Sequence, residues 1–330
     1  MKLEKLLALL GLFAVLAGAV LVKKVVTERA AARSGEAPVL VALYPDVSAA
    51  FVDTVTLYKG KDADATSRVV LSKAPSGDWK MSSRGGARAA RATVEGFLKA
   101  VGRMKGEPRA QSSSVLKDFR LTEEEAVHVE LARPGGKAVH FLVSPIRPGR
   151  SGNFVRDRAS DSVVVASEDL LSMMGVYDRD GAPNYKSFAD LQVVPLDLTK
   201  VERAELATDA EGRLALVREG EGASASWRFD PADGNVDRSK VTSFLAGVYN
   251  LYASDVPASP PPADAFAAAG ESWLLVKEKD APAKALDLGS LDPDQKAYLV
   301  RVRPEGLVYR VPQAAIEGIK KTKSFFKAAS

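Results

Sequence analysis

Apolar residues recur with helical spacing in two distant stretches of the chain. In the first, Val94, Phe97, Leu98, Val101 and Met104 follow the i, i+3, i+4, i+7, i+10 pattern of an amphipathic helix. Most charged residues of the stretch lie off this stripe. A second stripe has the same spacing and nearly the same residue types: Val241, Phe244, Leu245, Val248 and Leu251. Each pattern predicts a helix that covers a sheet.

The same elements precede both helices. Val69–Leu71 is a short apolar run, followed by a Pro- and Gly-containing turn and by Trp79 on a second strand. Leu214–Val217 is a similar run, and Trp227 begins the strand after it. Because the order of parts repeats, we expect Trp79 and Trp227 to be equivalent and their indoles to be buried in the same way.

Short strands separated by turn residues follow each helix, which predicts an antiparallel meander in each half. The predicted strands of the first meander are 126–131, 138–143, 153–156 and 162–166, and those of the second are 272–276, 285–288, 297–302 and 307–311. The predicted fold class is α+β, in two tandem repeats that span residues 50–186 and 187–330.

The segments directly after the two helices differ in composition. Gly106 and Pro108 are expected to end the first helix, and 109–117 reads as a polar loop. The corresponding second segment, 255–264, contains four prolines and is expected to be extended. Pro312 is expected to open a last helix with Ile316 and Ile319 inward.

The N-terminal residues 1–24 are predicted to form an uncleaved transmembrane helix. The run from Leu6 to Val22 is uncharged and bracketed by lysines, and it rises about 26 Å as a helix. Ala17-Gly18-Ala19 leaves signal-peptide cleavage as an alternative. Flanking positive charge is nearly balanced, and the favoured orientation places the bulk of the chain outside the cytoplasmic membrane. Residues 25–49 are expected to be a juxtamembrane spacer.

Composition narrows the function classes. Hydrophobic residues make up 46% and charged residues 27% of the 330 residues, which is typical of a folded protein. The net charge is only +4 and basic residues are scattered among acidic ones, so nucleic acid is not an expected partner. The absence of cysteine excludes disulfides, thiolate metal sites and a cysteine nucleophile.

No reactive constellation stands out, and we assign no catalytic, cofactor-binding or metal-binding residues. His128 and His140 are expected to face each other across a hairpin, but they lack a third metal ligand. Ser114–Lys117 matches S-x-x-K without its partner motifs, and Gly135–Lys137 is an incomplete phosphate loop. Asp178–Gly181 resembles only the start of a calcium loop.

The chain resembles the bacterial domain of unknown function 4340 family. The resemblance is carried by Leu6–Val22, Lys73–Lys80, Val94–Met104, Phe154–Arg156, and Trp227 together with Val241–Val248. It implies a membrane-anchored protein that faces the periplasm or cell exterior and accompanies a gliding-type ABC exporter. The family provides no catalytic residues to transfer.

Three hypotheses about function follow. The leading one is a non-enzymatic accessory protein that contacts lipid through Leu6 to Val22 and has an ABC transporter permease as its partner. The alternative is a module that binds cell-wall glycan or peptide in a groove between the lobes, near Trp79 or Trp227. The third is a hydrolase that uses carboxylates such as Asp46, Asp53 or Glu95, which the sequence does not pair. The oligomeric state is not indicated.

Overall fold

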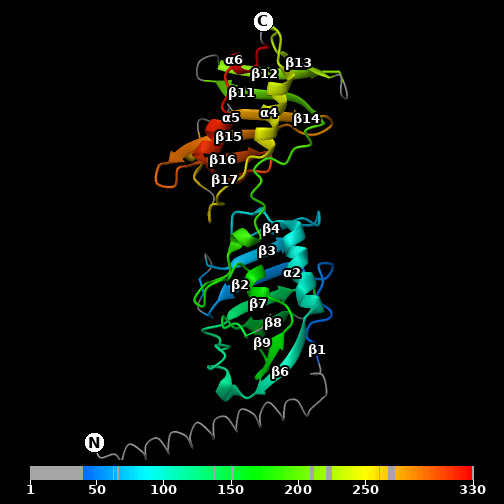
Figure 1. Ribbon diagram of the computed structural model, residues 1–330, viewed down its shortest axis with the longest axis vertical. Coiled ribbons are helices and arrows are strands. Elements are labelled where there is room, and N and C mark those ends of the chain that lie inside the picture. The colour runs from blue at the N-terminus through cyan, green and yellow to red at the C-terminus, as the bar shows by residue number, and fades with distance from the viewer. Residues whose placement is uncertain are drawn as a thin grey trace, which may run out of the picture.

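The computed structural model describes residues 40–328 except for short gaps at 62, 65–66, 137, 150–151, 209–211, 221–224, 260 and 267–271. These residues form two sheets with a few helices, so the fold belongs to the α+β class as predicted (Figure 1). The predicted anchor, and the spacer as far as residue 39, lie outside them. None of the helices in the described part of the chain is both long and apolar enough to span a membrane.

The first sheet has ten strands, and all neighbours in it are antiparallel. Its order is β1-β6-β10-β9-β8-β7-β2-β3-β4-β5. The strands are β1 (Val41–Ala42), β2 (Thr54–Lys59), β3 (Val69–Lys73), β4 (Trp79–Met81), β5 (Ala87–Arg88), β6 (Lys105–Gln111), β7 (Val127–Ala132), β8 (Val139–Val143), β9 (Asn153–Asp157) and β10 (Ser162–Ala166). With its helices, this sheet is here called the first lobe.

The second sheet has seven antiparallel strands in the order β13-β12-β11-β14-β15-β16-β17. They are β11 (Val201–Thr208), β12 (Gly212–Glu219), β13 (Ser226–Phe229), β14 (Leu274–Glu278), β15 (Lys284–Asp292), β16 (Ala297–Arg303) and β17 (Leu307–Pro312). With its helices, it is the second lobe.

One long helix occupies the same place in each lobe. In chain order the helical segments are α2 (Arg91–Arg103), η1 (Ser113–Val115), α3 (Leu170–Met173), η2 (Tyr185–Ser187), α4 (Arg238–Tyr249), η4 (Ala263–Ala265), α5 (Gln313–Ile319) and α6 (Lys323–Phe326). The long helix α2 follows the β3–β4 hairpin and its short partner β5, and α4 follows the β12–β13 hairpin.

Helix α2 packs on the first sheet through the predicted stripe. Val94, Phe97, Leu98 and Val101 are fully buried, and the Phe97 ring meets Phe188 edge-on at 5.8 Å between centroids. Burying each of these side chains contributes roughly 1.5–3 kcal/mol. Helix α4 buries its own stripe in the same way. Asp237 caps α4 by accepting hydrogen bonds from the backbone of Ser239 and Lys240.

The chain order of paired strands is the same in both sheets. In the first lobe β4-β3-β2-β7-β8-β9 are neighbours, and in the second β13-β12-β11-β14-β15-β16 take the same positions. In the first lobe Trp79 pairs with Lys73, and two residues further along β4 Met81 pairs with Leu71. In the second lobe Trp227 pairs with Arg218, and two residues further along β13 Phe229 pairs with Leu216. The predicted equivalence of the two tryptophan positions therefore holds in strand register.

One local prediction is wrong in part. Helix α2 ends at Arg103, as expected, but residues 109–111 of the predicted polar loop belong to strand β6, which pairs with β10. Pro108 fits there because it sits where the register of β6 and β10 shifts, opposite Val164. The prediction for the last helix is confirmed, because Pro312 is the N-cap of α5 and both Ile316 and Ile319 are buried; a further short helix, α6, begins at Lys323.

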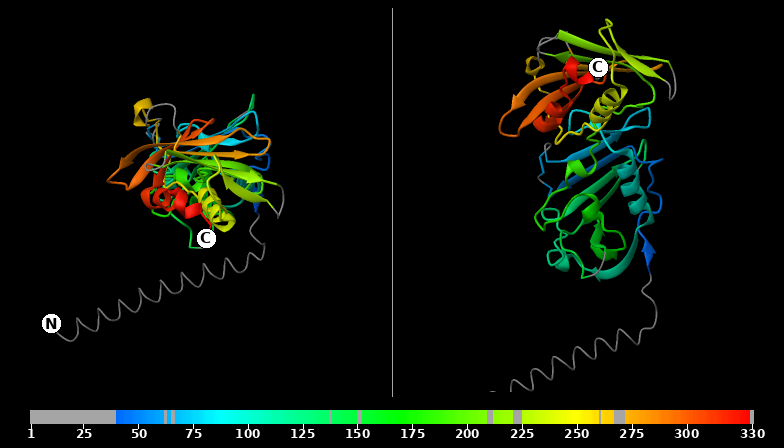
Figure 2. Two further views of the ribbon diagram at one scale, coloured as in Figure 1. Left: turned by 90° about the horizontal axis from the view of Figure 1, so that it is seen from above. Right: turned by 45° about the horizontal axis from the view of Figure 1, so that its top comes forward.

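The two lobes lie end to end, with the second lobe above the first in Figure 1 and in the right view of Figure 2. The edge that carries β4 and β5 faces the β17 edge of the second sheet. Buried residues of the connecting segment, such as Phe188, Val193 and Val194, belong to one apolar cluster with residues of both lobes. The connection between the lobes is therefore packed rather than open.

Candidate functional site

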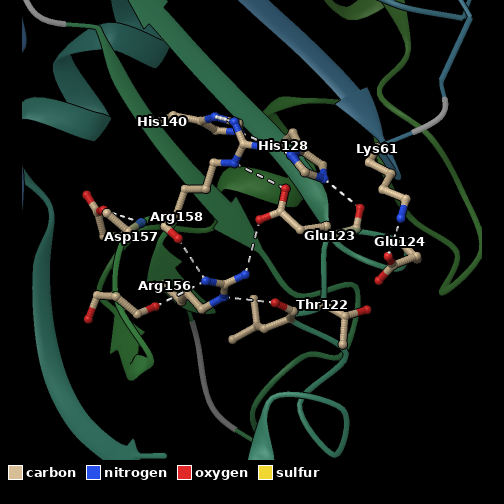
Figure 3. Close-up of polar contacts among 12 residues, drawn as sticks. Lys61, Thr122, Glu123, Glu124, His128, His140, Arg156, Asp157 and Arg158 are labelled. Atoms are coloured by element: carbon tan, nitrogen blue, oxygen red, sulfur yellow. Dashed lines mark hydrogen bonds and ion pairs between the residues drawn. The ribbon is translucent and has the colours of Figure 1, made fainter. Parts of the chain in front are cut away.

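The two histidines meet on the face of the first sheet opposite α2. His128 on β7 and His140 on β8 are diagonal neighbours, because His128 pairs with Leu142 and His140 with Glu130. Their Nδ1 and Nε2 atoms lie 3.1 Å apart (Figure 3). The prediction that they face each other is confirmed, and His128 is buried rather than exposed, at 1%.

Hydrogen-bond partners fix the tautomers of both rings. His128 Nε2 lies 2.8 Å from the carbonyl oxygen of Glu123, which only accepts, so this nitrogen carries the proton. His128 Nδ1 then accepts from His140 Nε2. His140 Nδ1 in turn accepts from the Arg158 guanidinium at 3.3 Å. This chain of donors and acceptors is complete only when both imidazoles are neutral.

Burial lowers the pKa of both histidines. For His128, removal from water outweighs the opposing effects of the Glu123 carbonyl and carboxylate. For His140, burial again has the largest effect, and the Glu130 carboxylate opposes it. Glu130 lies 3.7 Å from His140 Nδ1, so it attracts the imidazolium if one forms. The pair is therefore held neutral over a wider pH range than free histidine.

Two arginines tie the segment before β7 to the sheet (Figure 3). Arg156 Nη2 lies 3.3 Å from one Glu123 oxygen, and Arg158 Nε lies 3.2 Å from the other. Arg156 also donates to the carbonyl of Leu121 at 2.9 Å, although its side chain is almost fully buried. A buried guanidinium is tolerated only when its donors are satisfied, as they are here. The network therefore fastens the 121–123 segment over the sheet.

Tyr58 closes the network at the β2 side. Its ring stacks on His128, with centroids 4.6 Å apart, and its hydroxyl donates to Glu130 Oε1 at 2.5 Å. The guanidinium carbon of Arg68 lies 4.4 Å from the centre of the same ring. Burial, followed by the bond to Glu130, raises the pKa of Tyr58. The phenol is therefore a fixed donor and not a poised base.

A hollow of about 750 Å³ lies beside this network. His140 and Arg158 line it, together with Arg133, Asp46 and Asp157. Tyr44 forms another wall and stacks on Phe141 at 4.8 Å. Two arginines therefore face two carboxylates, so the hollow has no strong charge preference. All four imidazole nitrogens form hydrogen bonds within the network. The reaction that this arrangement leaves open to the two histidines is protonation.

The other candidate residues have structural partners. The hydroxyl of Ser114 forms a hydrogen bond with the hydroxyl of Ser112 at 2.8 Å, and not with the Lys117 amine of the S-x-x-K match. Asp180 pairs with Arg120 at 3.1 Å. Glu95 pairs with Arg91 on the surface of α2. In the described chain, none of Asp46, Asp53 and Glu95 is hydrogen-bonded to another of the three, and no group of three or more His, Asp or Glu residues is arranged to hold a metal ion.

The two tryptophans differ in exposure, contrary to the expectation of equal burial. Trp79 is 1% exposed and belongs to the apolar cluster that also contains the buried residues of α2. Trp227 is only partly buried and lines a hollow near the start of α4. The reason is position, because β4 has the further neighbour β5 whereas β13 is the last strand of its sheet.

Residues at the joint between the lobes were not found by sequence reasoning. Arg88 of β5 lies 3.2 Å from Asp190 and donates to the carbonyls of Gln192 and Val193. Tyr185 donates to Asp255 of the second lobe. A single arginine at the end of a short strand gives no periodic signal, so only the fold could reveal this role.

Comparison with known proteins gives one match. The family model described as "Domain of unknown function (DUF4340)" matches residues 79–269, more than half of the chain. The match begins in β4 of the first lobe and ends before β14 of the second, so it includes α2, the joint and α4. No curated protein and no solved structure matches the chain.

Proposed function

The chain belongs to the domain of unknown function DUF4340 family, and from that premise we propose that it is a non-enzymatic, membrane-anchored accessory protein. Leu6 to Val22 would hold it in the cytoplasmic membrane, and the two lobes would lie outside, beside an ABC-type transport complex. The observation that carries the proposal is the repeated strand order of two sheets joined by a packed connection.

We infer that the lobes are two copies of one α+β unit. The pairs β2 and β11, α2 and α4, and β7 and β14 occupy the same places in the strand order. A duplicated unit of this kind provides extended surface without a shared reactive centre. The histidine network of the first lobe also favours a structural role, because its side chains form hydrogen bonds and ion pairs with one another and with the backbone.

The end-to-end arrangement suggests how the surfaces would be presented. Strand β1, which directly follows Leu40 in the chain, lies at the end of the first lobe opposite the second lobe (Figure 1). A chain anchored before Leu40 would therefore project its second lobe away from the bilayer. This arrangement also separates the basic C-terminal segment around Lys321 and Lys323 from the membrane of the anchor.

Co-purification tests the accessory role. The full chain, tagged at its C-terminus, is extracted in mild detergent, and co-purifying membrane proteins are quantified by mass spectrometry. The expected result is enrichment of a permease over a control in which the anchor carries an unrelated domain. A monodisperse monomer that enriches no membrane protein over this control would contradict the proposal.

The second candidate is a binding module for cell-wall glycan or peptide, and the partial exposure of Trp227 favours it. Trp79 is enclosed and cannot serve as a platform. The hollow lined by both lobes, between Gly85 and Pro257, is about 40 Å³ and too small for a sugar ring. Shielding of every indole from acrylamide would remove this candidate; quenching that is lost in Trp227→Phe supports it.

A further inference from the structure

The sheet edges that face each other at the joint are connected through main-chain hydrogen bonds. Two segments lie between strands β5 and β17: residues 188–193, here called the first link, and residues 251–255, here called the second link. Three isolated antiparallel bridges mark the contacts from the end of β5 to β17: Ala89 with Ala189, Gln192 with Tyr252, and Asp255 with Arg310. Each link is therefore paired on both of its sides.

The first link is held by backbone hydrogen bonds toward β5 and toward the second link. The bonds, each written from amide to carbonyl, are Asp190 to Arg88 (3.0 Å), Ala90 to Phe188 (2.7 Å), Val193 to Leu251 (2.9 Å) and Ala253 to Leu191 (2.8 Å). In these bonds the even-numbered residues of the link pair toward β5, and the odd-numbered residues pair toward the second link. An inner strand of an antiparallel sheet alternates in this way, so the first link takes the place of such a strand.

The second link continues the pairing into the second sheet. The Ser254 amide donates to the Arg310 carbonyl at 2.8 Å, and the Arg310 amide donates to the Asp255 carbonyl at 2.9 Å. Beyond these bonds β17 pairs with β16, and at the other end β5 pairs with β4. Backbone hydrogen bonds therefore run from the ten-stranded sheet through both links into the seven-stranded sheet, a path here called the joint ladder.

Side chains reinforce the joint ladder. Gln192 Nε2 donates to the Tyr249 carbonyl at 2.9 Å, which ties the first link to the end of α4. Val193 and Leu251 are buried in the apolar cluster that both lobes share. A hinge needs residues that are free to change their backbone angles, whereas both links are held by hydrogen bonds to neighbours on either side. Rotation of one lobe against the other would break these bonds and expose part of the shared cluster.

We propose that the chain is a rigid spacer, in which the joint ladder holds the second lobe at one distance and in one orientation relative to the first. Tandem domains move relative to each other by default, unless the contact between them is extensive. In a chain anchored before Leu40, a rigid spacer fixes the height of the second lobe above the bilayer. The rigidity is independent of the proposed accessory role, whereas the use of that height to meet a partner rests on it.

Pulsed electron paramagnetic resonance tests the proposal by measuring the distances between two spin labels, and the full chain suits it because it contains no cysteine. Labels at Lys99→Cys on α2 and Ser243→Cys on α4, both exposed positions, report the separation of the lobes. A pair within the first lobe, Lys99→Cys and Gln111→Cys, reports the width that the labels alone produce. In detergent micelles and in lipid nanodiscs we expect one interlobe peak, at most about twice as wide as the peak of the pair within the lobe.

Ala253→Pro tests the joint ladder as the cause of the rigidity. Proline removes the amide that donates to Leu191, so it breaks the pairing of the two links. The interlobe distribution should become at least about twofold wider, while the pair within the first lobe keeps its width. Ala258→Pro, exposed and outside both links, is the matched control and should leave both distributions unchanged. Circular dichroism checks that each variant is folded, and the width in the chain without proline substitutions tests the proposal even if Ala253→Pro is not.

Two results would overturn the proposal: a broad or divided interlobe distribution in the chain without proline substitutions, or an interlobe peak that stays narrow in folded Ala253→Pro. The first would show that the lobes move about the joint, and the second that backbone pairing is not what fixes them. Neither result bears on co-purification with a permease, so the two proposals fail separately.

Discussion

The two lobes share a strand order, but their sheets end differently: the first continues beyond β10 with β6 and β1, and the second ends at β17. In the first lobe, β6 continues from α2 and pairs with β10 over five residue pairs. In the second lobe, the segment in the same place contains prolines, and its described residues form a single bridge, from Asp255 to Arg310 of β17. Proline lacks the amide hydrogen that a ladder needs, so the added strand is reduced to a point contact. The side chain of Asp255 also accepts a hydrogen bond from Tyr185 at the joint.

The outer faces of the sheets differ as well. In the first lobe the segment before β7 covers the sheet through Leu121 and Ala126, which form a small core with Leu142 and Val163. The histidine network fastens that cover. In the second lobe, in contrast, a hollow of about 600 Å³ lies on β11, β12 and β14, with the exposed Lys277 at its wall. The first lobe thus covers the outer face of its sheet with its own chain, while the described residues of the second lobe leave a hollow there.

Replacing each tryptophan by alanine gives the largest contrast. Trp79→Ala should lower the free energy of unfolding by about 3–5 kcal/mol, because it empties a fully buried site. Trp227→Ala should cost only about 1–2 kcal/mol, because its ring is already partly in water. Urea denaturation of the two variants measures the difference. Equal losses would mean that the lobes bury their indoles alike.

Arg88→Ala tests whether the lobes are held together by the joint. Losing the donor to the carbonyls of Gln192 and Val193 should cost about 2–3 kcal/mol and separate the thermal unfolding of the lobes into two transitions. Arg91→Ala, which removes an exposed pair on α2, is the control and should leave the melting curve unchanged. A single unaltered transition in Arg88→Ala would show that the apolar contacts suffice.

The histidines make the first lobe alone sensitive to mildly acidic pH, because the chain has no others. Their pKa values are lowered in the folded state, so between about pH 6.5 and 5 the unfolded chain binds more protons. Stability should therefore fall with pH in that window, by at most about 1.4 kcal/mol per pH unit for each histidine.

Urea midpoints between pH 7.5 and 5 measure this dependence. His128→Gln/His140→Gln should flatten the slope in that window while leaving the acid-induced loss below pH 4.5, which comes from carboxylates such as Asp169. A slope that persists in the double variant would assign the effect to other groups.

Tyr309→Phe is expected to have the smallest effect, with the opposite sign. The Tyr309 hydroxyl is buried, and it has no hydrogen-bond partner in the described part of the chain. Removing it should stabilise the protein by up to about 1 kcal/mol while keeping the ring near Arg88. Tyr298→Phe, at a more accessible position, should be neutral by the same denaturation assay. Destabilisation by Tyr309→Phe would indicate that the hydroxyl has a partner.

Local sequence signals predicted most of the helices and strands. The stripe from Val94 to Met104 and the turns around Gly77 depend on near neighbours only, so they could be read from the chain. Strand β6 was missed because its residues are polar and include Pro108; its pairing depends on β10, far along the chain. The Glu123–Arg156 pair and the Arg88 joint likewise require a tertiary register that no local pattern contains.

A crystal structure of the full chain tests the central claim of duplication most directly. Superposing β2–β4, α2 and β7–β10 on β11–β13, α4 and β14–β17 should overlay each element on its counterpart, with Trp79 on Trp227. A different strand order in the two lobes, or tryptophans on non-equivalent strands, would contradict the claim.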